Sequence, residues 1–160
     1  MRERMVKLAI ADTPYFLYSD FELRRKGNTY TAQTLSLLRE EYREDVFYFI
    51  IGADSLYQIE QWFHPELVMK LAVLLVAGRA YHDDHQPFDR QIEYLTARYG
   101  AKIYPIRCRE MDVSSEEIRA SVFDGHSIHG FVPDAVEEYI KDHGLYGGGV
   151  KTPVLAGKGE

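Results

Sequence analysis

The chain has 160 residues, of which 46% are hydrophobic and 28% charged, and its net charge is −6. These values are typical of one globular domain, and the negative charge excludes a general basic surface for nucleic acid. The sequence has no apolar run long enough to cross a membrane. The single cysteine, Cys108, excludes an internal disulfide. With no signal-peptide pattern either, we predict a cytoplasmic protein.

Helices and strands are predicted to alternate along the chain, because apolar periodicity and turn residues alternate. In chain order the predicted elements are a helix over 1–11, a short strand over 15–18, a polar turn over 24–28, a helix over 31–42, a strand over 46–51, a short helix over 55–62, a helix starting near Pro65, a strand over 72–77, a polar loop over 81–89, a helix over 90–99, a strand over 102–106, a helix starting at Ser114 and a helix over 133–143. The strands over 46–51 and 72–77 are apolar, and we expect both to be buried, the first on both faces. This alternation predicts an α/β fold with a parallel sheet.

Polar groups follow the predicted strands, where parallel sheets bind their ligands. Gly52 and Asp54 follow one strand, Gly78-Arg79 the next, and 112–119 the last, so we expect them to converge on one crevice. At Gly52 a ligand can approach the backbone. Asp54 could accept hydrogen bonds from ribose hydroxyls or steer a metal ion, and an N-cap for a helix starting at Ser55 is an equal alternative.

Ser114, Ser115 and Arg119 mark the start of the next helix. Ser114 is a suitable N-cap, and Glu117 three residues later completes a capping box. Free N–H groups at such a helix end bind phosphate, and Arg119, one turn further on, adds a planar set of donors. An ordinary capped surface helix is the alternative.

Aromatic residues form a second candidate site. Trp62 is the only tryptophan, and Phe63 follows it. The pair could sandwich a flat heterocycle, although such pairs more often belong to the core. Tyr30-Thr31 starts a helix, with Thr31 as a plausible N-cap that could bind an anion.

Other chemistry is not indicated. The histidines and aspartates of 82–85 lack a second cluster at zinc-site spacing, so we predict a solvated loop, with a metal site as the weaker alternative. Neither a Walker A loop nor a G-x-G-x-x-G motif occurs, and no catalytic residue can be identified.

Taken together, these segments resemble the bacterial nicotinate-nucleotide adenylyltransferase family. The matching stretches are KLAIAD at 7–12, YTAQTL at 30–35, FIIGADSL at 49–56 followed by Trp62, VSSEEIR at 113–119, and the segment from Val132-Pro133 to the closing Gly144-Leu145-Tyr146. The stretch from Gly52 to Trp62 and the Gly-Leu-Tyr ending are the most specific to this branch of the nucleotidyltransferase superfamily.

The resemblance implies a Rossmann-like nucleotidyltransferase fold that joins nicotinic acid mononucleotide to the AMP part of ATP. The products would be deamido-NAD, a precursor of NAD, and pyrophosphate, with Mg²⁺ on the ATP. Gly52 and Asp54 would meet the nucleotide, and Ser114, Ser115 and Arg119 would hold the ATP phosphates. Of the residues left for the mononucleotide, Trp62 and Phe63 would stack its pyridine ring, and Tyr30 and Thr31 would fix its carboxylate.

The resemblance covers residues 2 to 146 and departs from the family at its start. The family opens with G-G-T-F-D-P-x-H-x-G-H, and no H-x-G-H occurs in this sequence. We therefore expect 1–146 to be a nucleotidyltransferase domain without its first βαβ unit, followed by a disordered tail over 147–160. The alternatives are a pantetheine-phosphate type of nucleotidyltransferase and a non-catalytic nucleotide-binding remnant. A homo-oligomer is also left open.

Overall fold

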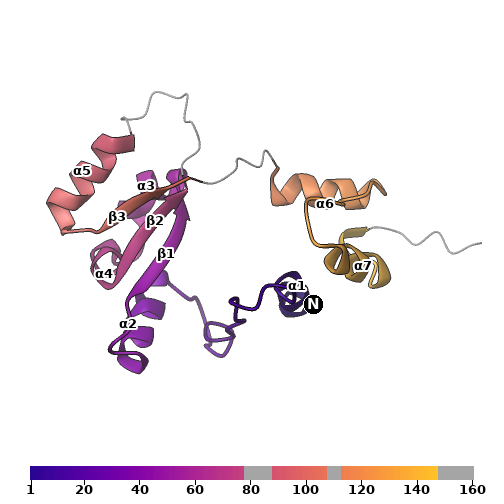
Figure 1. Cartoon of the computed structure of the whole chain (residues 1–160), viewed down its shortest axis with the longest axis horizontal. Helices are drawn as coiled ribbons and strands as arrows, with labels where there is room; N and C mark the ends of the chain where they lie inside the picture. The colour runs from indigo at the N-terminus through magenta and orange to yellow at the C-terminus, as the bar shows by residue number, and fades with distance from the viewer. Residues whose placement is uncertain (78–87, 108–112, 148–160) are drawn as a thin grey trace, which may run out of the picture. The chain divides into compact units, whose positions relative to one another are not determined.

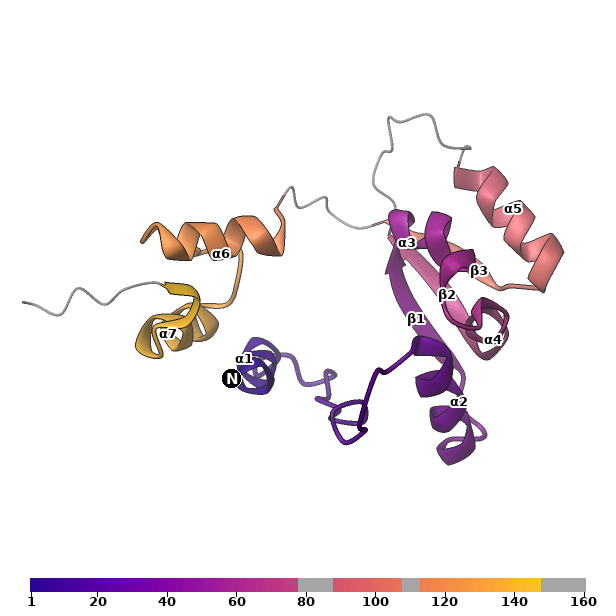
Figure 2. The same cartoon turned by 180° about the vertical axis from the view of Figure 1, so that it is seen from behind.

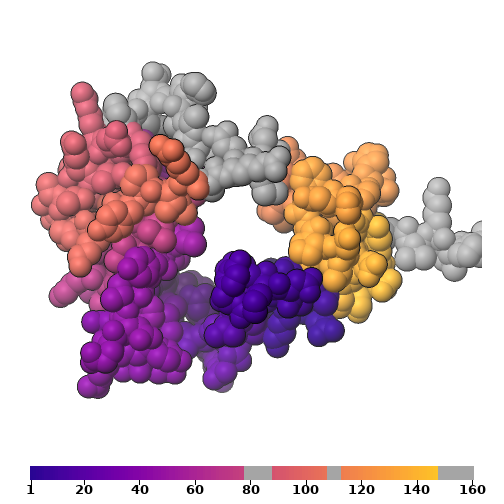
Figure 3. Space-filling view, viewed as in Figure 1, coloured from indigo at the N-terminus to yellow at the C-terminus, as the bar shows by residue number. Residues whose placement is uncertain are grey.

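The computed structural model describes residues 1–77, 88–107 and 113–147, and Figure 3 draws the remaining residues in grey. The chain divides into two compact units. The sheet unit is Asp20–Glu110, and the helical unit combines Met1–Ser19 with Met111–Glu160. Each unit has its own hydrophobic core.

Three parallel strands form the sheet unit's only sheet within the described residues. They are β1 (Phe47–Gly52), β2 (Ala72–Ala77) and β3 (Ile103–Ile106), in the order β1-β2-β3 (Figures 1 and 2). Gly52 pairs with Ala77, and Ala77 pairs with Ile106. The carboxyl ends of all three strands therefore meet at one edge, and the predicted parallel α/β fold is confirmed.

The helical segments of the sheet unit precede the first strand or connect the strands along the chain. They are α2 (Thr31–Glu41), α3 (Ala53–Gln58), the short 3-10 helix η1 (Ile59–Gln61), α4 (Pro65–Leu71) and α5 (Phe88–Tyr99). Their apolar side chains, among them Leu56, Val68 and Leu95, form one core with Leu74 and Val76 of the central strand. The crossover from β1 to β2 contains α3, η1 and α4, and the crossover from β2 to β3 contains α5. Parallel strands need such connections, since a tight turn cannot join them.

Strand β1 differs from its prediction, because only one of its faces is covered. Tyr48 and Ile50 are 63% and 64% exposed, whereas Ile51 is 6% exposed. Successive side chains point to opposite faces of a sheet, and the core packs on the face that bears Phe49 and Ile51. The prediction of burial on both faces was wrong for β1, while β2 is buried along most of its length, as predicted.

In the helical unit, the first helix of the chain packs with helices from its later part. It contains α1 (Arg2–Ala9), α6 (Ser115–Phe123), α7 (Asp134–Asp142) and the short 3-10 helix η2 (Leu145–Gly147). Its core consists of the buried apolar residues Val122, Ile128, Val136 and Ile140, with Met5 and Leu8 packed against them. The helix predicted over 1–11 is therefore present as α1, and Met5 and Leu8 on one of its faces contact this core.

The short strand predicted over 15–18 is absent. Tyr15, Phe16 and Leu17 are exposed, and the Phe16 N–H closes a turn onto the Thr13 carbonyl at 3.0 Å. A strand needs a neighbour to accept its ladder hydrogen bonds, and no strand pairs with this segment in the described residues.

Helix ends largely follow the local signals. Gly100 ends α5 with a φ of +63°, a conformation that favours glycine. Helix α5 begins at Phe88, two residues before the predicted start. Gly78-Arg79, Cys108, the tail after Gly147 and most of the polar loop predicted over 81–89 lie outside the described residues. Within the described part of the chain, no helix is both long enough and apolar enough to span a bilayer.

Candidate functional site

At the carboxyl edge of the sheet, Gly52 ends β1 and is the N-cap of α3. Its φ of −80° suits any residue, and a Cβ placed there would meet nothing within 4 Å. The fold therefore does not itself require a glycine at this position. An exposed backbone at a strand end is open to a close approach by a ligand.

Asp54 lies in the first turn of α3 and is exposed. It is not the N-cap, so the alternative role suggested by the sequence is wrong: the helix begins earlier, at Ala53. In the described part of the chain its carboxylate has no hydrogen-bond or ion-pair partner. It remains available to a hydroxyl or a cation at the edge where parallel sheets bind ligands.

Tyr30 and Thr31 start α2, as predicted, but the prediction of Thr31 as the N-cap was wrong. Tyr30 is the N-cap, in extended conformation, and Thr31 is the first helical residue. The Tyr30 carbonyl accepts a hydrogen bond from Thr34 N at 3.0 Å, and no side chain caps the helix. The first N–H groups of α2 have no partner within the helix, as at any helix start.

Trp62 and Phe63 lie directly after η1 and face different neighbours. Trp62 is partly buried against the core, and its ring meets Phe49 edge-on at 6.3 Å between centroids. The Phe63 ring stacks on Tyr30, with centroids 4.5 Å apart and planes at 28°. The structure thus brings together two predicted substrate residues, Tyr30 and Phe63. Trp62, the residue before Phe63, packs against the core instead.

No role was predicted for His64, the residue after Phe63. Its φ of +50° is left-handed, which is uncommon for a residue other than glycine, and it caps α4 just before Pro65. Its ring meets the Phe63 ring edge-on, with centroids 4.2 Å apart, and its Nδ1 lies 2.9 Å from Glu66 Oε1. This hydrogen bond from His64 lowers the pKa of Glu66.

A cavity of about 290 Å³ adjoins this aromatic pair between α2 and α4. Its lining residues are Arg25, Ala32, Gln33, Ser36, Leu37, Phe63, His64 and Leu67. The Arg25 guanidinium donates to Gln33 Oε1 at 2.9 Å and to Thr34 Oγ1 at 3.3 Å. These bonds attach the segment before α2 to the helix itself, so they hold the Tyr30 corner in place.

In the helical unit, the start of α6 confirms the predicted capping box. Ser114 Oγ accepts from Glu117 N at 3.1 Å, and Ser114 N donates to Glu117 Oε2 at 2.6 Å. Hydrogen bonds from the Ser114 side chain and from the Ser114 N–H lower the pKa of Glu117, because they favour its charged form. The capping box thus uses the Ser114 and Glu117 N–H groups, so these two donors are not free for a ligand.

Other donors remain at this helix end. Ser115 and Arg119 are exposed, and in the ranges that the structure describes neither side chain has a hydrogen-bond or ion-pair partner. A first-turn N–H, the two serine hydroxyls and an unpaired guanidinium suit an anionic oxygen. Gly52 and Asp54 belong to the other unit, and their convergence with this helix end on one nucleotide stays a prediction.

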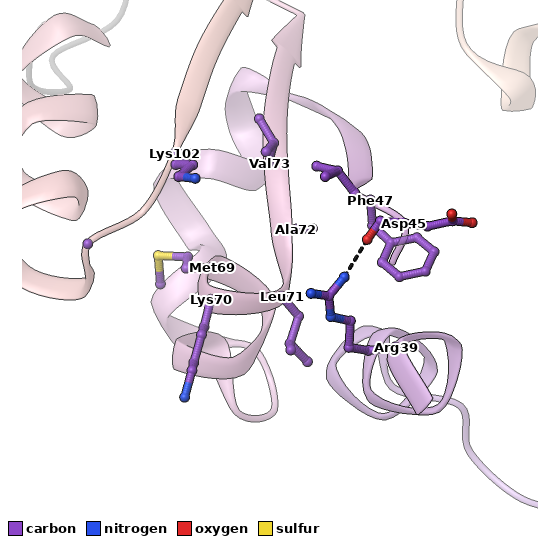
Figure 4. A pocket seen from close by; sticks show the side chains of 11 residues that line it. Arg39, Asp45, Phe47, Met69, Lys70, Leu71, Ala72, Val73 and Lys102 are labelled. Carbon is purple, nitrogen blue, oxygen red and sulfur yellow. Dashed lines mark hydrogen bonds between the residues drawn. The ribbon is translucent and has the colours of Figure 1, made fainter. Parts of the chain in front are cut away.

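A second cavity, of about 210 Å³, lies at the opposite, amino ends of the strands (Figure 4). Arg39, Lys70 and Lys102 are among its lining residues, and the Arg39 guanidinium donates to the Asp45 carbonyl. Arg39 and Lys70 lie in the last turns of α2 and α4. Cations there offset the negative ends of the helix dipoles, so their presence needs no ligand.

His129, Asp134 and Glu137 also gather in the helical unit, with ligand atoms within 4.8 Å of one another. His129 Nδ1 lies 2.8 Å from Asp134 Oδ1. Buried Glu137 already accepts from Ser127 Oγ at 2.9 Å and pairs with Lys141 Nζ at 2.8 Å. The Glu137 carboxylate is thus already paired with the Lys141 ammonium. We assign the cluster a structural role, in which it joins residues 127–129 to α7.

The parallel sheet, its helical crossovers and the polar groups beyond its strand ends define a Rossmann-like α/β protein. No family model matches the chain. A curated relative from Lachnoclostridium phytofermentans, named probable nicotinate-nucleotide adenylyltransferase, is 47% identical over 145 residues, which are 91% of this chain and 72% of the relative. One with the same name from Syntrophotalea carbinolica is 37% identical, with the same two coverages. The chain belongs to the nicotinate-nucleotide adenylyltransferase family, as its sequence motifs predicted.

Solved structures support the fold independently. Two chains of Plasmodium falciparum nicotinic acid mononucleotide adenylyltransferase, described as complexed with APC and with NaAD, match with TM-scores of 0.69 and 0.70. Each match covers 94% of this chain, and about three quarters of the neighbour, at 20% and 18% identity. At such low identity the likeness establishes the fold alone.

Proposed function

We propose that this chain transfers AMP from ATP to nicotinic acid mononucleotide, which yields deamido-NAD and pyrophosphate. The observation that carries the proposal is the 47% identity to a curated relative across 91% of the chain. The matched 91% of the chain includes residues of both units.

For ATP, we assign the phosphates to Ser114, Ser115 and Arg119, and the rest of the nucleotide to Gly52 and Asp54. The α6 end offers hydroxyl and guanidinium donors, which suit phosphate oxygens. ATP would enter as its magnesium complex. The exposed Asp54 carboxylate is a hard oxygen ligand of the type that Mg²⁺ accepts.

For the mononucleotide, we assign the pyridine ring to Trp62 and Phe63, and its carboxylate to Tyr30 and Thr31. The Tyr30–Phe63 stack supports this assignment, since it holds two half-exposed aromatic rings beside the N-terminus of α2. Aromatic faces favour a flat ring, and the positive end of a helix favours a carboxylate.

In this reaction an oxygen of the mononucleotide phosphate attacks the α-phosphorus of ATP. The new P–O bond forms as the bond to the β-phosphate oxygen breaks, and pyrophosphate leaves with those electrons. A phosphate oxygen is already anionic at neutral pH, so no side chain has to remove a proton. The residues assigned here act by positioning the two substrates and by offsetting charge on the phosphates.

The proposal is tested on the purified chain with magnesium, ATP and nicotinic acid mononucleotide, with pyrophosphate and deamido-NAD as readouts. We expect both products in equal amounts. Phosphopantetheine replaces the mononucleotide in a parallel reaction. A preference for phosphopantetheine would reassign the acceptor, and mononucleotide binding without any product would indicate a non-catalytic module.

The Arg119→Ala variant tests the phosphate assignment. We expect ATP use to fall about 100-fold or more, because a lost contact to the reacting phosphates removes charge stabilisation. The fold should survive, because Arg119 is exposed and has no partner in the described residues. Arg90→Ala on α5 is the control, since Arg90 is likewise exposed. Equal ATP kinetics in the Arg119 and Arg90 variants would contradict the assignment.

The Trp62→Ala variant tests the pyridine assignment. We expect affinity for the mononucleotide to fall about tenfold, in line with one lost aromatic contact of about 1.4 kcal/mol. Trp62→Phe keeps an aromatic ring and should retain most of the affinity. ATP affinity, measured by calorimetry on the same samples, should not change. A Trp62→Ala chain that binds the mononucleotide as wild type does would remove Trp62 from the site.

A further inference from the structure

Glu60, in the middle of the short helix η1, receives hydrogen bonds from helix α5. The Tyr99 hydroxyl donates to Glu60 Oε1 at 2.8 Å, and the Tyr94 hydroxyl donates to the same oxygen at 3.2 Å. Arg98 Nη1 lies 3.4 Å from that oxygen and also contacts the Tyr94 hydroxyl. One carboxylate thus meets two phenols and a guanidinium, all from consecutive turns of one helix.

These partners are far away in sequence and fix the turn from one side. Glu60 is 34 residues from Tyr94 and 39 from Tyr99. Its side chain is 30% exposed, so the contact is partly shielded from water. The hydrogen bond to Glu60 raises the pKa of Tyr99, as expected for a phenol that must keep its proton to donate.

Ile59, the preceding residue, anchors the turn from the opposite side. It is fully buried in the core of the sheet unit. Its carbonyl accepts from Trp62 N at 3.1 Å, which closes the turn directly onto the tryptophan. The backbone of Trp62 is therefore set by η1, and η1 is held by Ile59 inside and Glu60 outside.

We infer that Glu60 is a positioning residue that orients the Trp62 ring for the flat ring of the acceptor nucleotide. This inference rests on the proposed function, in which Trp62 stacks the pyridine. A short 3-10 turn is held by few hydrogen bonds of poor geometry. The three α5 side chains supply the rigidity that the turn itself lacks, and a preorganised ring loses less entropy when it stacks on a ligand.

The single tryptophan allows a direct test of ring position without a ligand. Time-resolved fluorescence anisotropy of Trp62 is compared in the wild type, Glu60→Ala, Glu60→Gln and Glu93→Ala. Glu93 is the matched control, an exposed acid on α5 without a partner in the described residues. We expect a faster nanosecond depolarisation in Glu60→Ala, a smaller change in Glu60→Gln, whose amide oxygen still accepts, and none in Glu93→Ala.

The effect on binding is then measured by titration with nicotinic acid mononucleotide, with quenching of the Trp62 fluorescence as the signal. We expect Glu60→Ala to weaken binding about three- to tenfold, the range for one impaired aromatic contact. Affinity for ATP, measured by calorimetry, should stay unchanged. Tyr99→Phe removes one hydroxyl and should give an intermediate loss, so the test stands even if Glu60→Ala does not fold.

The outcomes separate the inference from the function beneath it. A wild-type chain whose fluorescence does not respond to the mononucleotide contradicts the proposed function. Unchanged anisotropy in folded Glu60→Ala and Tyr99→Phe chains overturns the positioning role, whatever the wild type binds. A lower melting temperature with unchanged anisotropy and unchanged mononucleotide affinity would show that the contact only stabilises the fold, and would also overturn it.

Discussion

At the scale of single residues, Gly52 is the position where a substitution best distinguishes an effect on ATP binding from an effect on the fold. Its backbone suits any residue and its Cβ position is open, so Gly52→Ala should leave the melting temperature of the chain nearly unchanged. We expect it to weaken ATP binding about tenfold, because a methyl group blocks close approach to the backbone. Calorimetric titration with ATP measures the effect.

Gly100→Ala is the converse control for that prediction. Gly100 has a φ of +63°, so alanine there is strained and should lower the melting temperature. It lies after the last residue of α5, near the amino ends of the strands, and ATP affinity should not change. If both variants bound ATP like the wild type, Gly52 would have no place in the nucleotide site.

What the sequence could predict at this scale depended on separation along the chain. Ser114 and Glu117 are three residues apart, and a helix places such residues in reach of each other, so their reciprocal hydrogen bonds were predictable. The contact between Glu60 and Tyr99 spans 39 residues and depends on how α5 packs. The Tyr30–Phe63 stack is likewise a product of packing, and no local pattern indicates it.

At the scale of elements, strand β1 offers a matched pair of neighbours. Ile50 is 64% exposed and Ile51 is 6% exposed. We expect Ile51→Ala to cost about 2–5 kcal/mol, as for other buried aliphatic side chains. Ile50→Ala should change stability by about 0.5 kcal/mol or less, like most surface substitutions. Urea denaturation followed by Trp62 fluorescence measures both, and equal losses would contradict the one-sided burial of β1.

The same strand shows why element predictions succeeded unevenly. Helix ends carry local signals such as Pro65 at a helix start and Gly100 after a helix end, and these were correct. The apolar sequence FYFIIG identifies a strand but does not reveal which face another layer covers. The segment 15–18 is apolar too, yet it forms no strand in the described residues because no partner strand accepts it.

At the scale of the whole molecule, the sequence predicted the parallel α/β fold and the family, both of which are confirmed. It did not indicate two compact units, one of which unites the first 19 residues with the segment from Met111 onward. Such long-range assembly leaves no local pattern. It arises from apolar faces such as that of Met5 and Leu8, which find their partners only in the folded chain.

The helical unit also has a buried carboxylate that makes its stability depend on pH. Lys141 and Ser127, together with the Ile128 N–H, lower the pKa of Glu137 from its ordinary value of 4.5. A group with a lowered pKa stabilises the fold above that ordinary value, and this contribution is lost as the pH falls through the folded pKa. We therefore expect the helical unit to lose stability in acid below 4.5.

Glu137→Gln isolates this contribution. At about pH 7 the variant should melt several degrees lower than the wild type, because a neutral amide pairs less well with Lys141. From about pH 7 to about pH 3 the gap should narrow, because the contribution of the charged carboxylate is lost as the pH falls through the folded pKa. Circular dichroism at the helical band follows the melting, and Trp62 fluorescence reports on the sheet unit in the same samples. A gap of equal size at both pH values would mean that the charge of Glu137 does not stabilise the helical unit.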